Sequence, residues 1–238
     1  MLKKALEYLM GLNEPHTEYI NGDTYSDKPL YRIGTYYPKA EPLRINTLTG
    51  MLDYIKSSTD EMVEKMIIEV SSPTSVVMYS SLDENRDREC LMEANAVLPE
   101  FKFDCFYDQE IFCISLQSKF IENDDRDLLL KFAGTVEAGT VAQYGDDGVS
   151  QKATIKTGLT SKSEALIPSP VKLKPYRTFP EIEQPESDFV FRMKEGHGGI
   201  ACAIFEADGG AWKFEAMQNI KAYLQEALKE YPQFTIIA

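Results

Sequence analysis

The sequence predicts an α+β fold with a mostly antiparallel sheet built from hairpins, and three observations support this prediction. Runs rich in β-branched residues occur in pairs separated by short turns, as at 65–72 and 75–82. Apolar residues recur at helical spacing at the N-terminus, in mid-chain and near the C-terminus. Strands and helices do not alternate regularly, which argues against a doubly wound nucleotide-binding fold. We expect a single domain over 1–238, whose sub-structure would be a mixed lobe at 1–127 and a β-rich lobe with a C-terminal helix and strand at 128–238.

The first element predicted is an amphipathic helix. Its apolar residues fall at helical spacing, at Leu2, Ala5, Leu6, Leu9 and Met10. Glu7 splits this apolar stretch, so the pattern favours a helix over an export signal. We expect the apolar stripe to pack on the helix's own domain, with a partner or a membrane surface as the alternatives. A polar, turn-rich loop follows at 13–31, and a short strand at 30–37 ends at Pro38.

The middle of the chain predicts two more helices around a group of strands. The segment 46–58 begins with Asn46 or Thr47 as a capping residue and repeats apolar residues at helical spacing. The hairpin at 65–82 is followed by a charged tip at 83–89.

Two further elements complete this half of the chain. A third strand is expected at 90–98, with a short helix as the alternative. A helix is expected at 107–123, with Asp108 near its N-terminus, where a carboxylate suits the helix dipole.

The second half is predicted to be mainly β. We expect a long hairpin from 128–144 and 149–158 that turns between Gly145 and Gly148. The segment 166–189 contains five prolines and should run extended, as an edge strand or a polyproline-like crossing.

The chain then returns to a hairpin, a helix and a last strand. The hairpin is expected from 189–194 and 200–207. A helix from about 211 to 230 follows, and Pro232 prevents its continuation. The strand at 234–238 closes the sequence.

The glycine corner in "FEADGGAW" raises the question of a ligand site. A phosphate-binding loop would require a lysine followed by serine or threonine, and that pattern is missing. The sequence instead predicts that Gly209 and Gly210 break the strand with positive φ and that Asp208 caps the next helix. We therefore assign structural turn or cap roles to Asp208, Gly209, Gly210, Gly145 and Gly148, and we assign no catalytic, cofactor-binding or metal-binding residue.

Charge and cysteine usage narrow the function classes. The net charge is −13, and residues 58–127 hold seventeen acids against six bases. This acidity argues against direct binding to a phosphate backbone and leaves a DNA-mimicking surface or a solvated face as interpretations. The four cysteines show no metal-binding or redox spacing, which predicts reduced, buried thiols in a cytoplasmic protein. No apolar run is long enough to cross a membrane.

Three long motifs carry a family resemblance: "GDDGVSQKATIKTG", "PSPVKLKPYRTFPEIEQPESDFVFRMKEG" and "AIFEADGGAWKFEAMQNIKAYL". Across 98–238 the chain resembles the YfdQ-like family of phage and prophage proteins, a domain of unknown function. The resemblance implies a phage-encoded protein in the cytoplasm of a bacterial host, and it supplies no cofactor and no catalytic residue.

Three functions follow as hypotheses. The first is a non-enzymatic protein that forms a homo-oligomer through exposed strand edges and the proline-rich crossing. The second is an acidic binding module that inhibits a host defence or recombination protein, acting as a DNA mimic. The third is an enzyme acting on nucleotides or nucleic acid, with His197, Glu206 and Asp208 around the glycine-rich turns.

Overall fold

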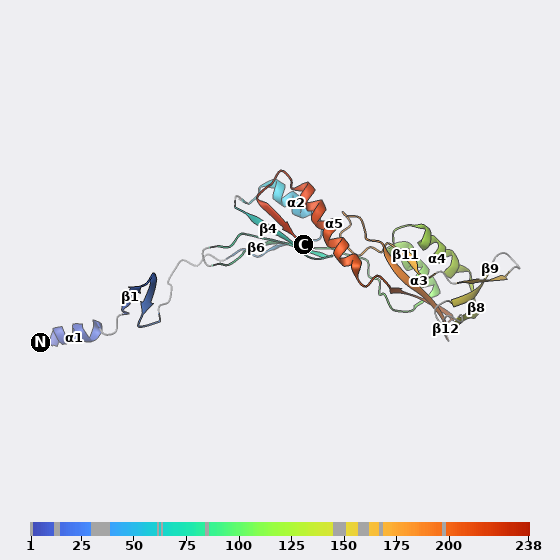
Figure 1. The fold of residues 1–238 in the computed structure, drawn as a ribbon, viewed down its shortest axis with the longest axis horizontal. Coiled ribbons are helices and arrows are strands. Elements are labelled where there is room, and N and C mark those ends of the chain that lie inside the picture. The colour runs from blue at the N-terminus through green and yellow to red at the C-terminus, as the bar shows by residue number, and fades with distance from the viewer. Residues whose placement is uncertain are drawn as a thin grey trace. The chain divides into compact units, whose positions relative to one another are not determined.

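The structure is a computed structural model, shown in Figure 1. It describes residues 2–11, 15–29, 39–60, 62, 64–83, 86–144, 151–156, 162–166, 169–196 and 199–238. The chain divides into two compact units, Met1–Lys39, which we call the arm, and Ala40–Ala238, which we call the body.

The arm contains one helix and one hairpin. Helix α1 (Leu2–Gly11) forms as predicted, and none of its residues is buried. Strand β1 (Thr17–Ile20) pairs antiparallel with β2 (Asp23–Ser26). The connecting Asn21 and Gly22 both have positive φ, 54° and 94°, as a two-residue hairpin turn requires. This hairpin lies where the sequence predicted a loop with at most an extended piece.

The body's first sheet has five strands in the order β14-β4-β5-β6-β3. Strands β4 (Met66–Ser72), β5 (Ser75–Tyr79) and β6 (Cys90–Asn95) are antiparallel neighbours, which confirms the predicted hairpin and third strand. Strands β3 (Leu43–Ile45) and β14 (Phe234–Ile237) join the two edges in parallel. The sheet is therefore mixed, although antiparallel pairs predominate in the body as predicted.

Two helices cover one face of this sheet. Helix α2 (Leu48–Ser57) begins after Thr47, whose side chain accepts a hydrogen bond from the N–H of Gly50, so the predicted cap is present. Helix α5 (Ala211–Ala227) packs on the same face through Ile220 and Leu224 (Figure 1). Together with alternate strand side chains, the two helices enclose the first hydrophobic core.

A second core lies under a four-stranded sheet in the order β11-β12-β13-β7. Strands β12 (Ser187–Gly196) and β13 (Gly199–Glu206) form the predicted hairpin. Strands β11 (Val171–Leu173) and β7 (Tyr107–Asp108) are its edges. Helix α3 (Gln109–Lys119) begins after Asp108, which accepts a hydrogen bond from Glu110 N–H, and buries Phe112 against Phe191.

Helix α4 (Asp124–Thr135) corrects the prediction of a strand from residue 128. Asn123 caps it by accepting a hydrogen bond from Arg126 N–H, and three aspartates occupy its first turn, where they suit the helix dipole. Leu129, Phe132 and Ala133 are buried at helical spacing. The β-rich composition of 128–144 therefore applies only from residue 136 onward.

A three-stranded sheet extends this part of the body. Strand β8 (Val136–Tyr144) pairs with β9 (Gln151–Lys156), as predicted, and β9 pairs with β10 (Lys162–Leu166), which the sequence did not predict. The turn between Gly145 and Gly148 and the strand expected at 30–37 lie outside the described residues.

The proline-rich crossing is an internal strap rather than a free surface. We call residues 174–186 the strap. Gln184 is buried in it, where its side-chain oxygen accepts hydrogen bonds from the N–H groups of Arg177 and Thr178. Thr178 also donates to Pro73 O, at 2.5 Å, in the β4–β5 turn. These hydrogen bonds are made within the body, so this part of the strap is held by its own chain; the first hypothesis expected the crossing to pair between subunits, and that expectation stays a prediction.

The two cores do not follow the division at residue 127. The first core combines α2, β4, β5 and β6 with α5 and β14 from the end of the chain. The second combines α3 and α4 with β11, β12 and β13. The strap joins them, because Phe179 and Ile182 lie in the first core whereas Leu173, just before the strap, lies in the second.

Candidate functional site

The glycine corner turns the chain from β13 into α5. Gly209 and Gly210 have φ of 64° and 82°, the left-handed conformation that the sequence predicted for them. An added Cβ at Gly209 would meet no atom within 4 Å in the described part of the chain. The backbone conformation, rather than a close approach by another group, therefore requires glycine.

Asp208 satisfies backbone N–H groups at the start of α5. One carboxylate oxygen accepts from Gly210 N–H at 2.9 Å, and the other accepts from Trp212 N–H at 3.4 Å and from Ser187 Oγ at 2.5 Å. The N-cap position itself is Gly210, so Asp208 acts from two residues earlier. Burial acts to raise the pKa of Asp208, but these hydrogen bonds and the charge of Arg177 hold it below its ordinary value.

Arg177 of the strap completes this site. Its side chain is 6% exposed, and Nη1 donates to Glu206 Oε1 at 3.0 Å. Nη2 donates to Ser187 Oγ and to Pro185 O. The guanidinium lies over the Trp212 ring, 4.1 Å from its centroid. We call Arg177 and the four side chains around its guanidinium the Arg177 cluster: Arg177, Ser187, Glu206, Asp208 and Trp212.

The electrostatics of the cluster are those of an internal anchor. Burial lowers the pKa of Arg177 to about 10, while Glu206 and Asp208 oppose this shift, so the guanidinium is charged at neutral pH. Its Nε and the indole N–H of Trp212 are buried and have no acceptor among the described residues. The carboxylates face a fixed cation, an arrangement that ties the strap to the glycine corner.

The sequence did not identify Arg177, because its partners are distant in the chain. Glu206 is 29 residues away, and only the β12–β13 hairpin brings it close. The third hypothesis named Glu206 and Asp208, which in the structure bind Arg177 and Ser187 respectively, and its enzymatic role stays a prediction. Its third residue, His197, lies outside the described residues. The residues that the structure describes contain no group of three or more side chains suited to hold a metal ion.

The cysteines are free but not uniformly buried. Cys202 is buried, which raises its pKa to about 12, and Cys90 and Cys113 are half-buried. Cys105 is exposed, so the expectation of four buried thiols is wrong at this position. Cys105 is in the loop before β7, where no strand or helix covers it within the described range.

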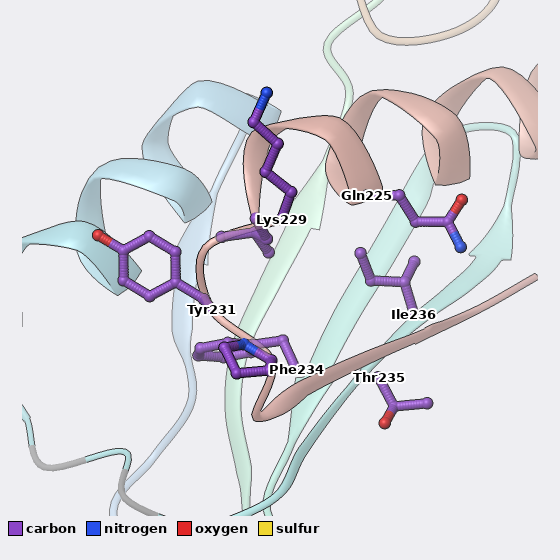
Figure 2. A pocket seen from close by; sticks show the side chains of 8 residues that line it. Gln225, Lys229, Tyr231, Phe234, Thr235 and Ile236 are labelled. Carbon is purple, nitrogen blue, oxygen red and sulfur yellow. The ribbon is translucent and has the colours of Figure 1, made fainter.

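A groove runs beside β14 and the end of α5. Its volume is about 400 Å³, and it is lined by Gln225, Leu228, Lys229, Tyr231, Pro232, Phe234, Thr235 and Ile236 (Figure 2). Gln225 from α5 and Ile236 from β14 lie side by side, while Lys229 points away from the strand. A neighbouring hollow of about 330 Å³ shares Tyr231 and Phe234 with it. We call the first of these hollows the C-terminal groove.

Strand β14, at the floor of this groove, is an edge strand with few protective features. It pairs with β4 on one side and has no other partner among the described strands. Its sequence, Phe-Thr-Ile-Ile, contains no charge and no proline, and Ile237 is 45% exposed. Natural edge strands are usually blunted by charged residues, proline or bulges. This edge therefore lacks the features that usually prevent pairing with another strand.

The acidic segment 58–127 does not belong to one element. Its residues extend from the five-stranded sheet, with Glu69 on β4 and Glu93 on β6, to the start of α4, with Asp124 and Asp127. Asp125 accepts a hydrogen bond from Lys172 N–H at 2.6 Å, so one of these acids is used within the fold. The DNA-mimic hypothesis stays a prediction.

None of the described helices is long and apolar enough to cross a membrane. Comparison with protein-family models, with curated proteins and with solved structures finds no match for this chain.

Proposed function

We propose that this chain is a non-enzymatic, phage- or prophage-encoded protein of the bacterial cytoplasm that assembles with copies of itself, and that β14 is the strand through which two copies pair. The phage origin rests on the sequence resemblance. The observation that supports self-assembly is the uncharged edge of β14, which has no partner strand on its outer side among the described strands.

The backbone of β14 identifies the groups available for pairing. Met66 N–H donates to Gln233 O at 2.9 Å, so alternate residues from Gln233 direct their backbone groups toward β4. By that alternation, Ile236 directs its N–H and C=O away from β4, toward the open edge. A second strand at this edge would accept a hydrogen bond from the N–H of Ile236 and donate one to its C=O.

A two-fold axis beside β14 makes the contact complementary to itself. Antiparallel pairing of β14 with its own copy requires the same residues from both subunits. Near the groove, Glu226 in the last turn of α5 and Lys229 just after the helix form an ion pair at 2.6 Å within one chain. Across a two-fold axis, antiparallel α5 helices present the acid of one copy to the base of the other. The charges therefore support pairing of identical copies, even though the chain as a whole is acidic.

The other edge of the same sheet offers a contrast. Strand β3 has only three residues, includes the exposed Arg44, and follows Pro42. A short edge with a cation and a nearby proline is protected against pairing. The same sheet thus has one protected edge and one open edge, and the proposal assigns assembly to the open one.

The test measures mass by light scattering for the whole chain at micromolar concentration. Wild-type protein is expected at twice the 27.0 kDa subunit mass or more. The double variant Thr235→Lys with Ile237→Lys places exposed like charges at the edge of β14 and should lose that pairing. Leu43→Lys, an equally exposed change on β3, is the matched control and should keep the wild-type mass. A monomeric wild type, or a β14 variant that keeps its mass, contradicts the proposal.

A further inference from the structure

The arm presents an apolar surface that the arm itself does not cover. Its large exposed apolar side chains are Leu2, Leu6, Tyr8, Leu9, Met10, Tyr19, Ile20 and Tyr25. Four of them, Leu2, Leu6, Leu9 and Met10, form one stripe along α1; Lys3 borders this stripe on the helical wheel, and Tyr8 lies on the other side of the helix. A ten-residue helix is marginally stable in water by itself, so α1 requires a surface to pack against.

The body has a second sheet face that α2 and α5 do not cover. Alternation along β4, β5 and β14 places half of their side chains opposite the first core. Strand register sets these residues in two rows, the first with Ile237, Glu69, Val77 and Glu93, and the second with Thr235, Ile67 and Tyr79. We call these two rows the open face. It combines aliphatic and aromatic side chains with two carboxylates.

We infer that α1 of one copy packs on the open face of a second copy. The apolar stripe of α1 would cover Ile67, Val77 and Tyr79, which are half-buried in the body and have no helix over them among the described elements. Helices commonly cover sheet faces in this way, because each element is apolar on one side. At about 15 Å, the helix matches the length of a short strand.

The charges favour docking of α1 on the open face of a second copy over docking of α1 on a membrane. Residues 1–39 hold five acids and five bases, so the arm is neutral and residues 40–238 carry the whole net charge of −13. Lys3, which borders the apolar stripe of this neutral arm, would meet the carboxylate of Glu69 on the open face, where Glu93 already pairs with Arg44 at 3.9 Å. An anionic bilayer would repel the acidic body, so the same charges disfavour a membrane surface.

The area of one helix also argues for a reciprocal contact. A stable interface buries about 800 Å² on each partner, more than one ten-residue helix covers. If two copies exchange their α1 helices, the contact is made twice. Pairing through β14 would hold the two copies together and raise the effective concentration of each arm at the other open face. In this respect the inference rests on the proposed function and names its second contact.

Cross-linking between tagged copies tests the contact. One copy of the full chain carries Leu6→Cys and the other carries Val77→Cys, both with Cys105→Ser to remove the exposed native thiol. Under mild oxidation we expect a disulfide between differently tagged copies. A control pair with Cys at Lys221, on α5 and away from the open face, should not cross-link. Cross-links that form only within one chain, or no cross-link, would overturn the inference.

A charge exchange gives an independent readout. Lys3→Glu, and separately Glu69→Lys, should each weaken self-association roughly tenfold, and the two together should restore it. Unchanged association in both would contradict the docking. If these variants have no effect while the β14 variant becomes monomeric, the inference fails and the proposed function stands. Capture of the wild-type chain by phosphatidylserine vesicles that is lost in Leu6→Glu would assign α1 to a membrane instead.

Discussion

The strap at 174–186 buries a charged and an amide side chain, whereas α1 in the arm carries a stripe of leucines and is exposed. Arg177 and Gln184 lie inside the body, at 6% and 2% exposure, where the strap, its neighbours and the glycine corner satisfy most of their polar groups. Leu2 and Leu9 are more than 60% exposed. Burial in this protein therefore follows from which groups find partners within one subunit, and polarity alone does not determine it.

This difference separates stability from assembly. The strap holds two cores together within one chain, so changes in it should lower the free energy of unfolding. The arm contributes no buried side chain from α1, so changes in that helix should affect contacts between copies. The following experiments test this division, beginning with the largest expected effect.

Replacing Arg177 should have the largest effect on stability. Arg177→Ala removes the hydrogen bonds to Ser187 and Pro185, the ion pair with Glu206 and the contact with Trp212. We expect the free energy of unfolding to fall by about 3 kcal/mol, at the low end of the range for broken buried pairs because Glu206 remains partly solvated. Urea unfolding measures it, and Glu183→Gln, an exposed change on the same strap, should cost less than about 1 kcal/mol. Equal losses of unfolding free energy in Arg177→Ala and Glu183→Gln would contradict the stabilising role of Arg177.

Replacing Gln184 should have the next largest effect. Gln184→Leu keeps a buried side chain of similar size but leaves the N–H groups of Arg177 and Thr178 without their acceptor. Each unsatisfied buried group costs about 1–3 kcal/mol, partly offset by the gain in apolar burial, so we expect a loss of about 2 kcal/mol. Urea unfolding again provides the measurement. A neutral result would show that the strap does not need its internal hydrogen bonds.

Acid should weaken the glycine corner through Asp208. Its folded-state pKa lies below the ordinary value, so the unfolded state binds the proton more readily. The contribution of Asp208 is complete above the ordinary aspartate pKa of about 3.9 and is lost as the pH falls through the lower folded-state pKa. Thermal melts between pH 6 and pH 2 (roughly the range that brackets this titration) should show a shallower decline in Asp208→Asn than in wild type. If the melting temperatures of the two proteins fall equally with pH, Asp208 does not cause the loss of stability in acid.

Changes in α1 should have the smallest effect on the fold. Leu6→Glu with Leu9→Glu alters exposed side chains, so the free energy of unfolding of dilute, monomeric protein should change by less than about 0.5 kcal/mol. The same variant should weaken self-association measured by sedimentation. A loss of stability comparable to that of Gln184→Leu would indicate that α1 packs on its own body, as the sequence analysis expected.

The sequence by itself determined the α+β class, the helices with capped or periodic patterns, and the positive φ of Gly209 and Gly210. These are local properties, since a capping side chain such as Thr47 or a glycine at a turn acts within a few residues. Periodicity did not reveal α4, because the β-branched composition after residue 135 obscured the caps at Asn123 and the aspartates that follow.

Only the tertiary structure decided that β14 lies at an edge parallel to β4, that the strap is internal, and that Arg177 meets Glu206. Each depends on segments far apart in sequence: Phe234 beside Met66, Thr178 beside Pro73 and Arg177 beside Glu206. Packing free energy summed over both cores selects these pairings, and no local pattern of charge or hydropathy encodes a partner at such a separation.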